Sequence, residues 1–203
     1  EKRDLVSHIY EDANWLLHMV ENLLSITRIT DGGANVLKKT PEAAEEVLFD
    51  AVSTSRKRYP DLQIKTVIPD EFVTAPMDPL LIKQVLLNLI ENAYFHARST
   101  KPLECTLSST EDAIKFCIRD YGTGIAPDRL SGIFDAVPSA PSSAASTVDT
   151  RKGMGIGLSI CKAIVNAHNG EITARNHAEG AEFRFTIPKE EIHHETNDTN
   201  PRH

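Results

Sequence analysis

The sequence predicts a compact α/β domain that follows a single long helix. Three observations carry this prediction. Apolar residues repeat with a helical period over residues 5–29, segments of helical and strand periodicity alternate from about 40 to 188, and two glycine-rich boxes lie among those segments. The chain is expected to divide at Asp31-Gly32-Gly33, because glycine commonly ends a helix.

The first helix has a broad apolar face. Ile9, Leu16 and Leu23 recur every seven residues, and Ala13 and Val20 form a neighbouring row. A lone helix with such a face needs partners. Residues 1–30 are therefore predicted to be one helix of a bundle, with 31–40 as a linker. Because the chain starts inside this pattern, we expect it to be a piece of a longer protein.

The second part is expected to begin with a helix. Thr40-Pro41-Glu42 combines a capping hydroxyl, a proline in the first turn and an acid, and this helix should run to about Arg58. Asp78-Pro79 should open another helix. Its inward residues are predicted to be Leu80, Leu81, Val85, Leu86, Leu89 and Ile90.

Further elements follow from the same periodicities. Strands are predicted at 63–68, 73–77, 103–109, 113–119, 171–176 and 182–187, a short helix at 128–134, and a helix from the second glycine box to about 167. Residues 136–150 are rich in Pro, Ser and Ala and should form a mobile loop, and the polar residues 189–203 should form a disordered tail.

The composition excludes several classes of protein. With 40% hydrophobic and 25% charged residues among 203, the chain should be globular. A net charge of −7 argues against nucleic acid as a partner. No apolar run reaches the roughly 18 residues that cross a bilayer. The three cysteines, Cys105, Cys117 and Cys161, form no CxxC and are expected to be free thiols that pack in the core.

An amide-rich helix offers the first candidate site. Asn88 and Asn92 are four residues apart and share a helix face, where amides buried without partners would be costly. They either cap neighbouring loops or hold a hydrated Mg²⁺ through a carbonyl oxygen. Glu91 lies one residue off this face, and His96 lies one turn further along.

The two glycine boxes suggest different ligand contacts. Asp120-Tyr121-Gly122-Thr123-Gly124-Ile125 follows a strand, so Asp120 is placed to accept a hydrogen bond from an exocyclic amine such as adenine N6, although a plain turn is the alternative. Gly153-Met154-Gly155-Ile156-Gly157-Leu158 opens a helix, whose N–H groups favour phosphate. It is neither a Walker A loop nor a Rossmann fingerprint, since no GK[ST] follows and a loop precedes it. Arg151 and Lys152 either add charge there or are solvated.

These motifs together resemble those of sensor histidine kinases. Residues 88–93 are similar to the N box, 120–124 to the G1 box, 153–158 to the G2 box, 133–135 to the start of the F box and 179–188 to the closing strand. The likeness covers about 34–188 and indicates the GHKL ATPase superfamily. Residues 22–29, with the glycines and lysines up to 39, resemble the second dimerisation helix and linker of Kdp-type osmosensitive potassium sensor kinases.

The resemblance implies an α+β fold. This is the Bergerat ATP-binding fold, a two-layer α/β sandwich with a mixed sheet and helices on one face, preceded here by one helix of a dimerisation bundle. Residues 41–188 would form the catalytic domain, with a lid at about 126–152 and with ATP and Mg²⁺ as cofactors.

The resemblance also implies residue roles. Asn88, Glu91 and Asn92 would be catalytic, with Asn92 on the metal. The residues placed at the nucleotide are Asn88, Asn92, His96, Asp120, Gly122, Gly124, Ile125, Phe134, Arg151, Lys152, Gly153, Gly155, Gly157 and Leu158.

Two departures from the family pattern stand out. Phe95 occupies a position that is usually basic, and residues 136–139 lack the second F-box phenylalanine and its nearby cation. We expect weaker lid closure and reduced activity. His8 and His18 lack the neighbouring acid and proline of a phosphoacceptor, so that histidine is expected upstream of Glu1 and the chain alone should not autophosphorylate.

The implied function is transfer of the ATP γ-phosphoryl group to that histidine and then to a cognate response regulator. The parent would be a homodimeric inner-membrane sensor, bound to the membrane through other segments, with this part in the cytoplasm. The alternative is a regulatory or degenerate GHKL module that binds nucleotide without kinase activity. A serine-directed kinase or ATPase of the superfamily is disfavoured by the helix at 5–29.

Overall fold

The computed structural model describes residues 37–97, 99, 101–135 and 156–190, together with 9, 13, 20, 22 and 24 of the first helix. The predicted loop at 136–150, the linker residues 31–36, most of the first helix and the tail from 191 lie outside the described residues. The elements are β1 (Thr40–Ala43), α2 (Ala44–Arg58), β2 (Ile64–Val67), β3 (Thr74–Met77), α3 (Pro79–His96), β4 (Leu103–Ser109), β5 (Ala113–Arg119), α4 (Pro127–Leu130), α5 (Ile156–Ala167), β6 (Ile172–His177) and β7 (Gly180–Pro188).

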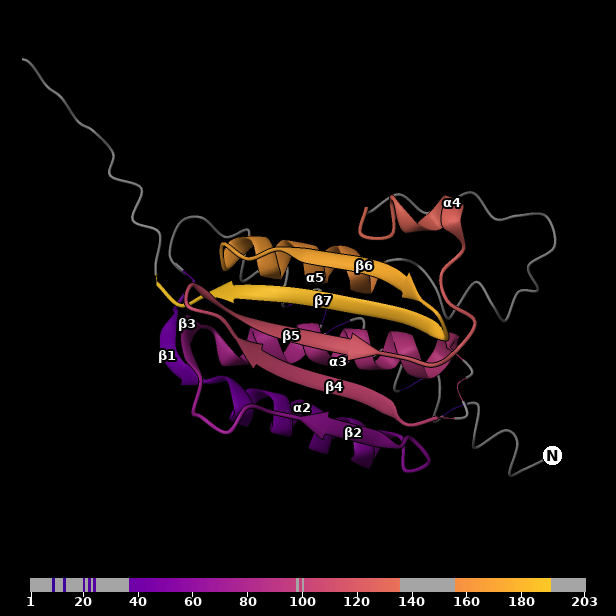
Figure 1. The fold of residues 1–203 in the computed structure, drawn as a ribbon, viewed down its shortest axis with the longest axis horizontal. Coiled ribbons are helices and arrows are strands. Elements are labelled where there is room, and N and C mark those ends of the chain that lie inside the picture. Colours follow the sequence, from indigo (N-terminus) through magenta and orange to yellow (C-terminus); the bar gives the residue numbers. More distant parts are fainter. Residues whose placement is uncertain are drawn as a thin grey trace, which may run out of the picture.

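The fold is a two-layer sandwich with a mixed sheet, as predicted. Five strands lie in the order β2-β4-β5-β7-β6, and β2 pairs with β4 in parallel while the other pairs are antiparallel. Strands β1 and β3 form a separate antiparallel pair. Helices α2, α3 and α5 all lie behind the sheet in Figure 1, so they cover one face of it.

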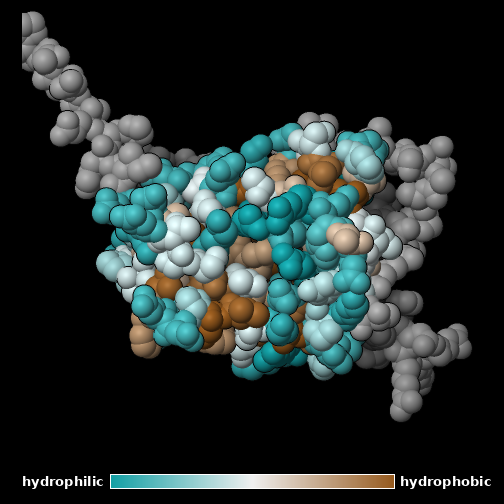
Figure 2. All heavy atoms as spheres, in the orientation of Figure 1, coloured by the Kyte–Doolittle hydropathy of each residue, from teal (hydrophilic) through white to brown (hydrophobic). Residues whose placement is uncertain are grey.

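The core lies between the sheet and these helices. Along β5 the buried residues alternate with half-buried ones, and β7 repeats this pattern toward its end. Phe116 and Phe185 are opposite each other in register and stack with 4.8 Å between ring centroids. Such a buried ring contributes roughly 1.5–3 kcal/mol relative to an exposed one. The other face of the sheet, in view in Figure 2, carries mostly hydrophilic side chains.

Helix α3 begins as the sequence predicts. Asp78 is its N-cap, and Oδ1 accepts hydrogen bonds from the N–H groups of Leu80 and Leu81 at 3.0 and 3.1 Å. The inward placement of Leu80 was wrong, because its side chain is 61% exposed while Ile82 is buried. At about 100° per residue, Leu80 lies off the stripe that the later leucines and isoleucines form.

The start of α2 also differs from the prediction. Thr40–Ala43 is not a helix start but strand β1, and Thr40 pairs with Met77 of β3. The helix begins at Ala44, whose N–H donates to the Val73 carbonyl oxygen at 2.9 Å. Pairing with a distant strand supplies ladder hydrogen bonds that outweigh a local capping preference of about 1 kcal/mol.

Candidate functional site

The amide face of α3 joins the start of α5. Asn88 is 4% exposed, and its Nδ2 donates to the Gly157 carbonyl oxygen at 3.3 Å. Its Oδ1 accepts from Nε2 of Gln84, one turn earlier, at 3.1 Å. The structure therefore brings together the predicted amide helix and the last glycine of the predicted phosphate-binding box.

Asn92 lies one turn further along α3 and is half-buried. No hydrogen bond of its side chain is found among the described residues. The described part of the chain also holds no cluster of three or more His, Cys, Asp or Glu side chains that could bind a metal. A Mg²⁺ ion commonly uses one or two protein oxygens together with substrate phosphates and water. The half-buried Asn92 amide suits this mode of binding, in which one protein oxygen shares the ion with phosphates and water. The described residues do not offer a group of carboxylates that would surround the ion.

Asp120 lies just after β5 and is 5% exposed. Its Oδ1 accepts hydrogen bonds from the N–H groups of Gly122 at 3.1 Å and Ala181 at 3.2 Å. No partner of Oδ2 is found among the residues that the structure describes. One carboxylate oxygen is thus fixed by the backbone, and the other is left as an acceptor.

The turn after Asp120 requires its glycines. A Cβ on Gly122 would lie 1.9 Å from the Ala97 carbonyl oxygen, and Gly124 has a φ of +71°. Asn176 of β6 fixes the end of this turn, because its Oδ1 accepts from the N–H of Ile125 at 2.8 Å and its Nδ2 donates to the Ile125 carbonyl oxygen at 2.7 Å. The sequence reading missed Asn176, since no local pattern pairs residues so far apart.

Gly180 is a second contributor that the sequence reading missed. A Cβ there would lie 2.4 Å from the Asp120 carbonyl oxygen and 2.8 Å from its Oδ1. Nε2 of His177 donates to the same carbonyl oxygen at 2.8 Å. The sequence feature that could have pointed to Gly180 and His177 is the turn between the last two predicted strands. The topology places this turn beside Asp120.

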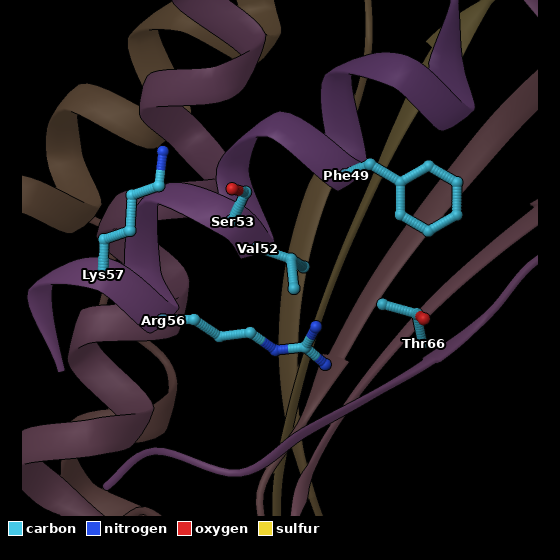
Figure 3. A pocket seen from close by; sticks show the side chains of 6 residues that line it. All are labelled: Phe49, Val52, Ser53, Arg56, Lys57 and Thr66. Carbon is cyan, nitrogen blue, oxygen red and sulfur yellow. The ribbon is translucent and has the colours of Figure 1, made fainter. Parts of the chain in front are cut away.

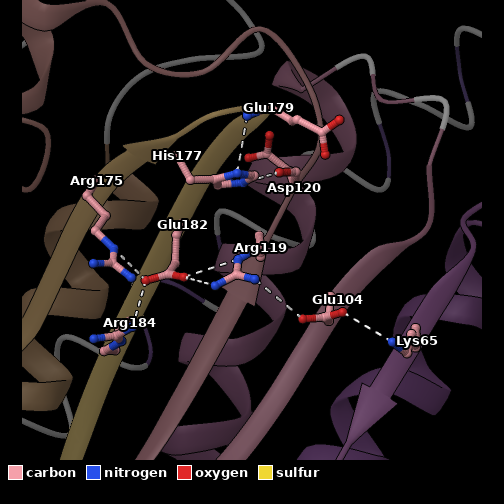
Figure 4. Close-up of polar contacts among 9 residues, drawn as sticks. All are labelled: Lys65, Glu104, Arg119, Asp120, Arg175, His177, Glu179, Glu182 and Arg184. Atoms are coloured by element: carbon pink, nitrogen blue, oxygen red, sulfur yellow. Dashed lines mark hydrogen bonds and ion pairs between the residues drawn. The ribbon is translucent and has the colours of Figure 1, made fainter.

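A row of charged side chains on the outer face of the sheet supports the end of β5 that precedes Asp120 (Figure 4). Glu182 has only 1% of its side chain exposed and accepts from Arg119 Nη2 at 2.6 Å, Arg175 Nε at 2.8 Å and Arg184 Nη2 at 2.8 Å. Burial raises the pKa of Glu182, but these hydrogen bonds and charges outweigh burial and lower the pKa to about 2. Arg119 and Glu182 pair across β5 and β7, so the cluster fixes the strand ends next to Asp120.

Asp120 also lines a pocket of about 400 Å³, a size that suits a small ligand. The other residues of its wall are Asp61, Leu62, Gln63, Ala93, Tyr94, Ala97, Ser99, Lys101 and Leu103. A second pocket, of about 420 Å³, lies between α2 and β2 and contains none of the predicted site residues (Figure 3). There Nη2 of Arg56 donates to the Ile64 carbonyl oxygen at 2.7 Å. Of these two pockets, the first is the one that adjoins a predicted site residue, Asp120.

Glu91 lies on a different side of α3. It is buried, and its Oε1 accepts from Arg58 Nη1 at 2.6 Å and from the Tyr59 hydroxyl at 3.2 Å. Burial and the Glu91 charge together raise the pKa of Tyr59. Phe95 packs edge-on against Tyr59 with 5.5 Å between centroids, and His96 is exposed at the helix end. Glu91 therefore joins α3 to the end of α2.

The remaining predicted site residues divide into two groups. Leu158 is buried at the start of α5, and Phe134 is half-buried and edge-on to Phe183 at 6.3 Å. Arg151, Lys152, Gly153 and Gly155 lie outside the described residues.

Known proteins resemble this chain in sequence. The family described as histidine kinase-, DNA gyrase B-, and HSP90-like ATPases matches residues 77–191. The chain is 40% identical over 190 residues to the sensor protein KdpD of Clostridium acetobutylicum, covering 93% of this chain and 21% of that protein. It is 35% identical over 175 residues to KdpD of Escherichia coli, covering 85% and 19%. The chain thus spans about a fifth of the length of these relatives.

Solved structures share the fold. Full-length ShkA in complex with AMPPNP has a TM-score of 0.69 at 26% identity, covering 92% of this chain and 38% of that one. The Acinetobacter baumannii histidine kinase AdeS has a TM-score of 0.70 at 21% identity, covering 92% and 85%. The catalytic domain of ThkA has a TM-score of 0.60 at 24% identity, covering 75% and 97%.

Proposed function

This chain belongs to the family of histidine kinase-, DNA gyrase B-, and HSP90-like ATPases, and from that premise we propose that it is the ATP-binding catalytic part of a two-component sensor histidine kinase. The observation that carries the proposal is Asp120. Its Oδ1 is fixed by two backbone N–H groups while its Oδ2 remains an acceptor, which suits recognition of an adenine N6 amine.

The other site residues would divide between base and phosphates. Gly122 and Gly124 let the backbone approach the base, and Ile125, Phe134 and Leu158 supply apolar surface. Asn88 and Asn92 would contact the phosphate end of the nucleotide, and the side-chain carbonyl oxygen of Asn92 would bind Mg²⁺. The ion would neutralise charge on the phosphates. The first turn of α5, with Gly157, presents N–H groups that favour anions.

The proposed reaction transfers the γ-phosphoryl group of ATP to a histidine nitrogen upstream of Glu1 and releases ADP. A response regulator would then receive the group. We extend the proposal to a homodimeric sensor of the potassium-responsive KdpD type, since both of the relatives reported above are KdpD proteins. We further propose that the parent protein attaches to the inner membrane through other segments. In the described residues no helix is long and apolar enough to span a membrane.

Titration of Mg–ATP against the wild type and Asp120→Asn tests nucleotide recognition. The amide keeps an oxygen for the two backbone N–H groups but turns an –NH₂ toward the base. Loss of a charged hydrogen bond is worth about 1.5–3 kcal/mol, so affinity for Mg–ATP should fall roughly 10- to 150-fold. The affinity for GTP should fall much less on this substitution, because O6 of guanine is an acceptor that can pair with the new –NH₂ group. Equal affinity of both proteins for Mg–ATP would contradict the proposal.

Phe95 favours a second candidate, a GHKL module that binds nucleotide without transferring phosphate. Its ring packs against Tyr59 and Tyr94 and occupies a position that is usually basic in the family. Incubation with ATP labelled in the γ-phosphate separates the two candidates. The parent protein should acquire an acid-labile label if it is a kinase and none if it is a binding module. The present chain should stay unlabelled, and a label on His8 or His18 would show that the acceptor assignment is wrong.

A further inference from the structure

Asn22 of the first helix lies against the amide face of α3. It is 1% exposed, and its Oδ1 accepts from Gln84 Nε2 at 3.1 Å and from Asn88 Nδ2 at 3.3 Å. The contact joins positions 66 residues apart, so neither helix alone predicts it. Three buried amides thus meet at the phosphate end of the proposed nucleotide site.

The face of the first helix is consistent with this contact. The exposed residues Ile9, Ala13, Val20 and Leu24 fall within an arc of roughly 60° when each residue turns the helix by 100°. Asn22 lies on the opposite side of the helix by the same count. The buried amide therefore belongs to the face that the first helix turns toward α3.

The hydrogen-bond partners fix which way each amide points. The Gly157 carbonyl can only accept, so the Asn88 atom beside it is the nitrogen and the atom beside Gln84 is the oxygen. The Asn22 atom that meets Asn88 Nδ2 must in turn be an oxygen. The other end of the Asn22 amide is consequently a donor, Nδ2, and it is buried without a partner among the described residues.

The hydrogens of Asn88 are fully used by this arrangement. Both N–H groups of Nδ2 are engaged, one by Gly157 and one by Asn22, while Oδ1 accepts one bond from Gln84 and keeps one lone pair. A buried donor that finds no acceptor is unfavourable and calls for an explanation. The nearby first turn of α5 carries the partial positive charge of a helix N-terminus. An anionic oxygen is the acceptor that this environment favours.

We propose that Asn22 is a residue of the nucleotide site that both positions Asn88 and binds phosphate. Its Oδ1 holds the Asn88 amide so that one lone pair of Asn88 Oδ1 serves the phosphate end, and its Nδ2 donates to a phosphate oxygen. The inference rests on the proposed function. It adds a residue of the preceding helix to a site otherwise built from residues between 84 and 181.

Calorimetric titration of the whole chain with Mg–ATP and with adenosine tests the inference. Asn22→Leu has a similar volume and removes both hydrogen-bonding groups. It should weaken Mg–ATP binding about three- to tenfold and leave adenosine binding unchanged, because adenosine has no phosphate. Asn22→Asp keeps an acceptor but replaces the donor by a negative oxygen, and should bind Mg–ATP more weakly than Asn22→Leu. Val20→Ala, an exposed change two residues away, is the control and should alter neither titration.

Two results would overturn the inference alone, and a third would overturn the proposed function as well. Unchanged or tighter Mg–ATP binding by Asn22→Leu would overturn the inference and leave the proposed function intact. Equal weakening for ATP and adenosine would also overturn it, since that result describes a general structural contact. If the folded wild type, checked by thermal melting, binds no Mg–ATP, the proposed function fails and the inference fails with it.

Discussion

At the scale of single residues, Asp120 is held by contacts from three segments of the chain. Backbone N–H groups of the following turn and of β7 fix its carboxylate, and a histidine of β6 holds its carbonyl oxygen. Two glycines, Gly122 and Gly180, are required because backbone atoms of other segments lie where a Cβ would be. The candidate adenine contact is therefore rigid before any ligand binds.

Gly122→Ala tests that rigidity. Its Cβ would lie 1.9 Å from a carbonyl oxygen of α3's C-cap residue, Ala97, so backbone must move. We expect a loss of about 1–3 kcal/mol and a fall in Tm of roughly 2–12 °C. Thermal melting by circular dichroism measures it. Gly132→Ala is the matched control, because its nearest neighbour would be Asp135 Oδ2 at an ordinary 3.6 Å and Tm should stay within a degree or two. Equal Tm values for the two variants would contradict the argument.

The sequence was informative about residues inside motifs and silent about their distant supports. Asp120 and Asn88 were recognisable because each is an unusual polar residue in a periodic apolar context. Asn176 and Asn22 could not be recognised, since their partners lie 51 and 66 residues away and only the folded topology brings them together. The nucleotide roles of these residues stay predictions.

At the scale of elements, strands β4 and β5 coincide with their predicted ranges because both alternate cleanly and face one core. The predicted start of α2 was wrong, because pairing of Thr40–Ala43 with β3 outweighed the local capping preference. Helices α3 and α5 are joined by a further long-range contact. Nε2 of His168, just after α5, accepts from the Asp78 N–H at 3.0 Å, while its Nδ1 donates to the Ile164 carbonyl oxygen at 2.8 Å. The ring is therefore neutral, with its proton on Nδ1.

This contact predicts a pH dependence of stability. Burial lowers the pKa of His168 from the usual value near 6.5, Lys39 lowers it further, and the Ile164 carbonyl and Asp78 raise it. Protonation of His168 at Nε2 removes the acceptor of the Asp78 backbone N–H. The stabilisation is thus complete above pH 6.5 and is lost as the pH falls below it, with a slope of up to about 1.4 kcal/mol per pH unit.

Urea unfolding at pH 7.5, 6.5 and 5.5 measures the effect. His168→Gln keeps an amide donor and acceptor that do not titrate, so its free energy of unfolding should fall less than that of the wild type over this range. The Glu182 cluster titrates between about pH 4.5 and 2 and does not interfere. The same fall in both proteins would assign the pH dependence to other groups.

At the scale of the whole molecule, the polar and apolar surfaces are separated. Part of the outer face of the sheet carries a network of paired charges, whereas the exposed face of the first helix carries Ile9, Val20 and Leu24 at 59%, 51% and 56% exposure. Aligned apolar side chains on one helix face are typical of an interface between helices. The described residues of this helix thus place Asn22 against α3 and expose apolar side chains on the opposite face.

That face predicts self-association of the chain through the first helix. Burying these side chains against a second copy would contribute about 25 cal/mol per Å² of apolar surface, whereas a charge at Val20 would have to be desolvated in the seam. Sedimentation velocity at increasing concentration should show a dimer for the wild type and a monomer for Val20→Glu, with Mg–ATP affinity unchanged. Phe72→Glu is the control, since Phe72 is 91% exposed but belongs to the loop before β3 and not to the first helix. A wild type that stays monomeric, or a dimer that only Phe72→Glu dissociates, would show that the helix face is not the interface.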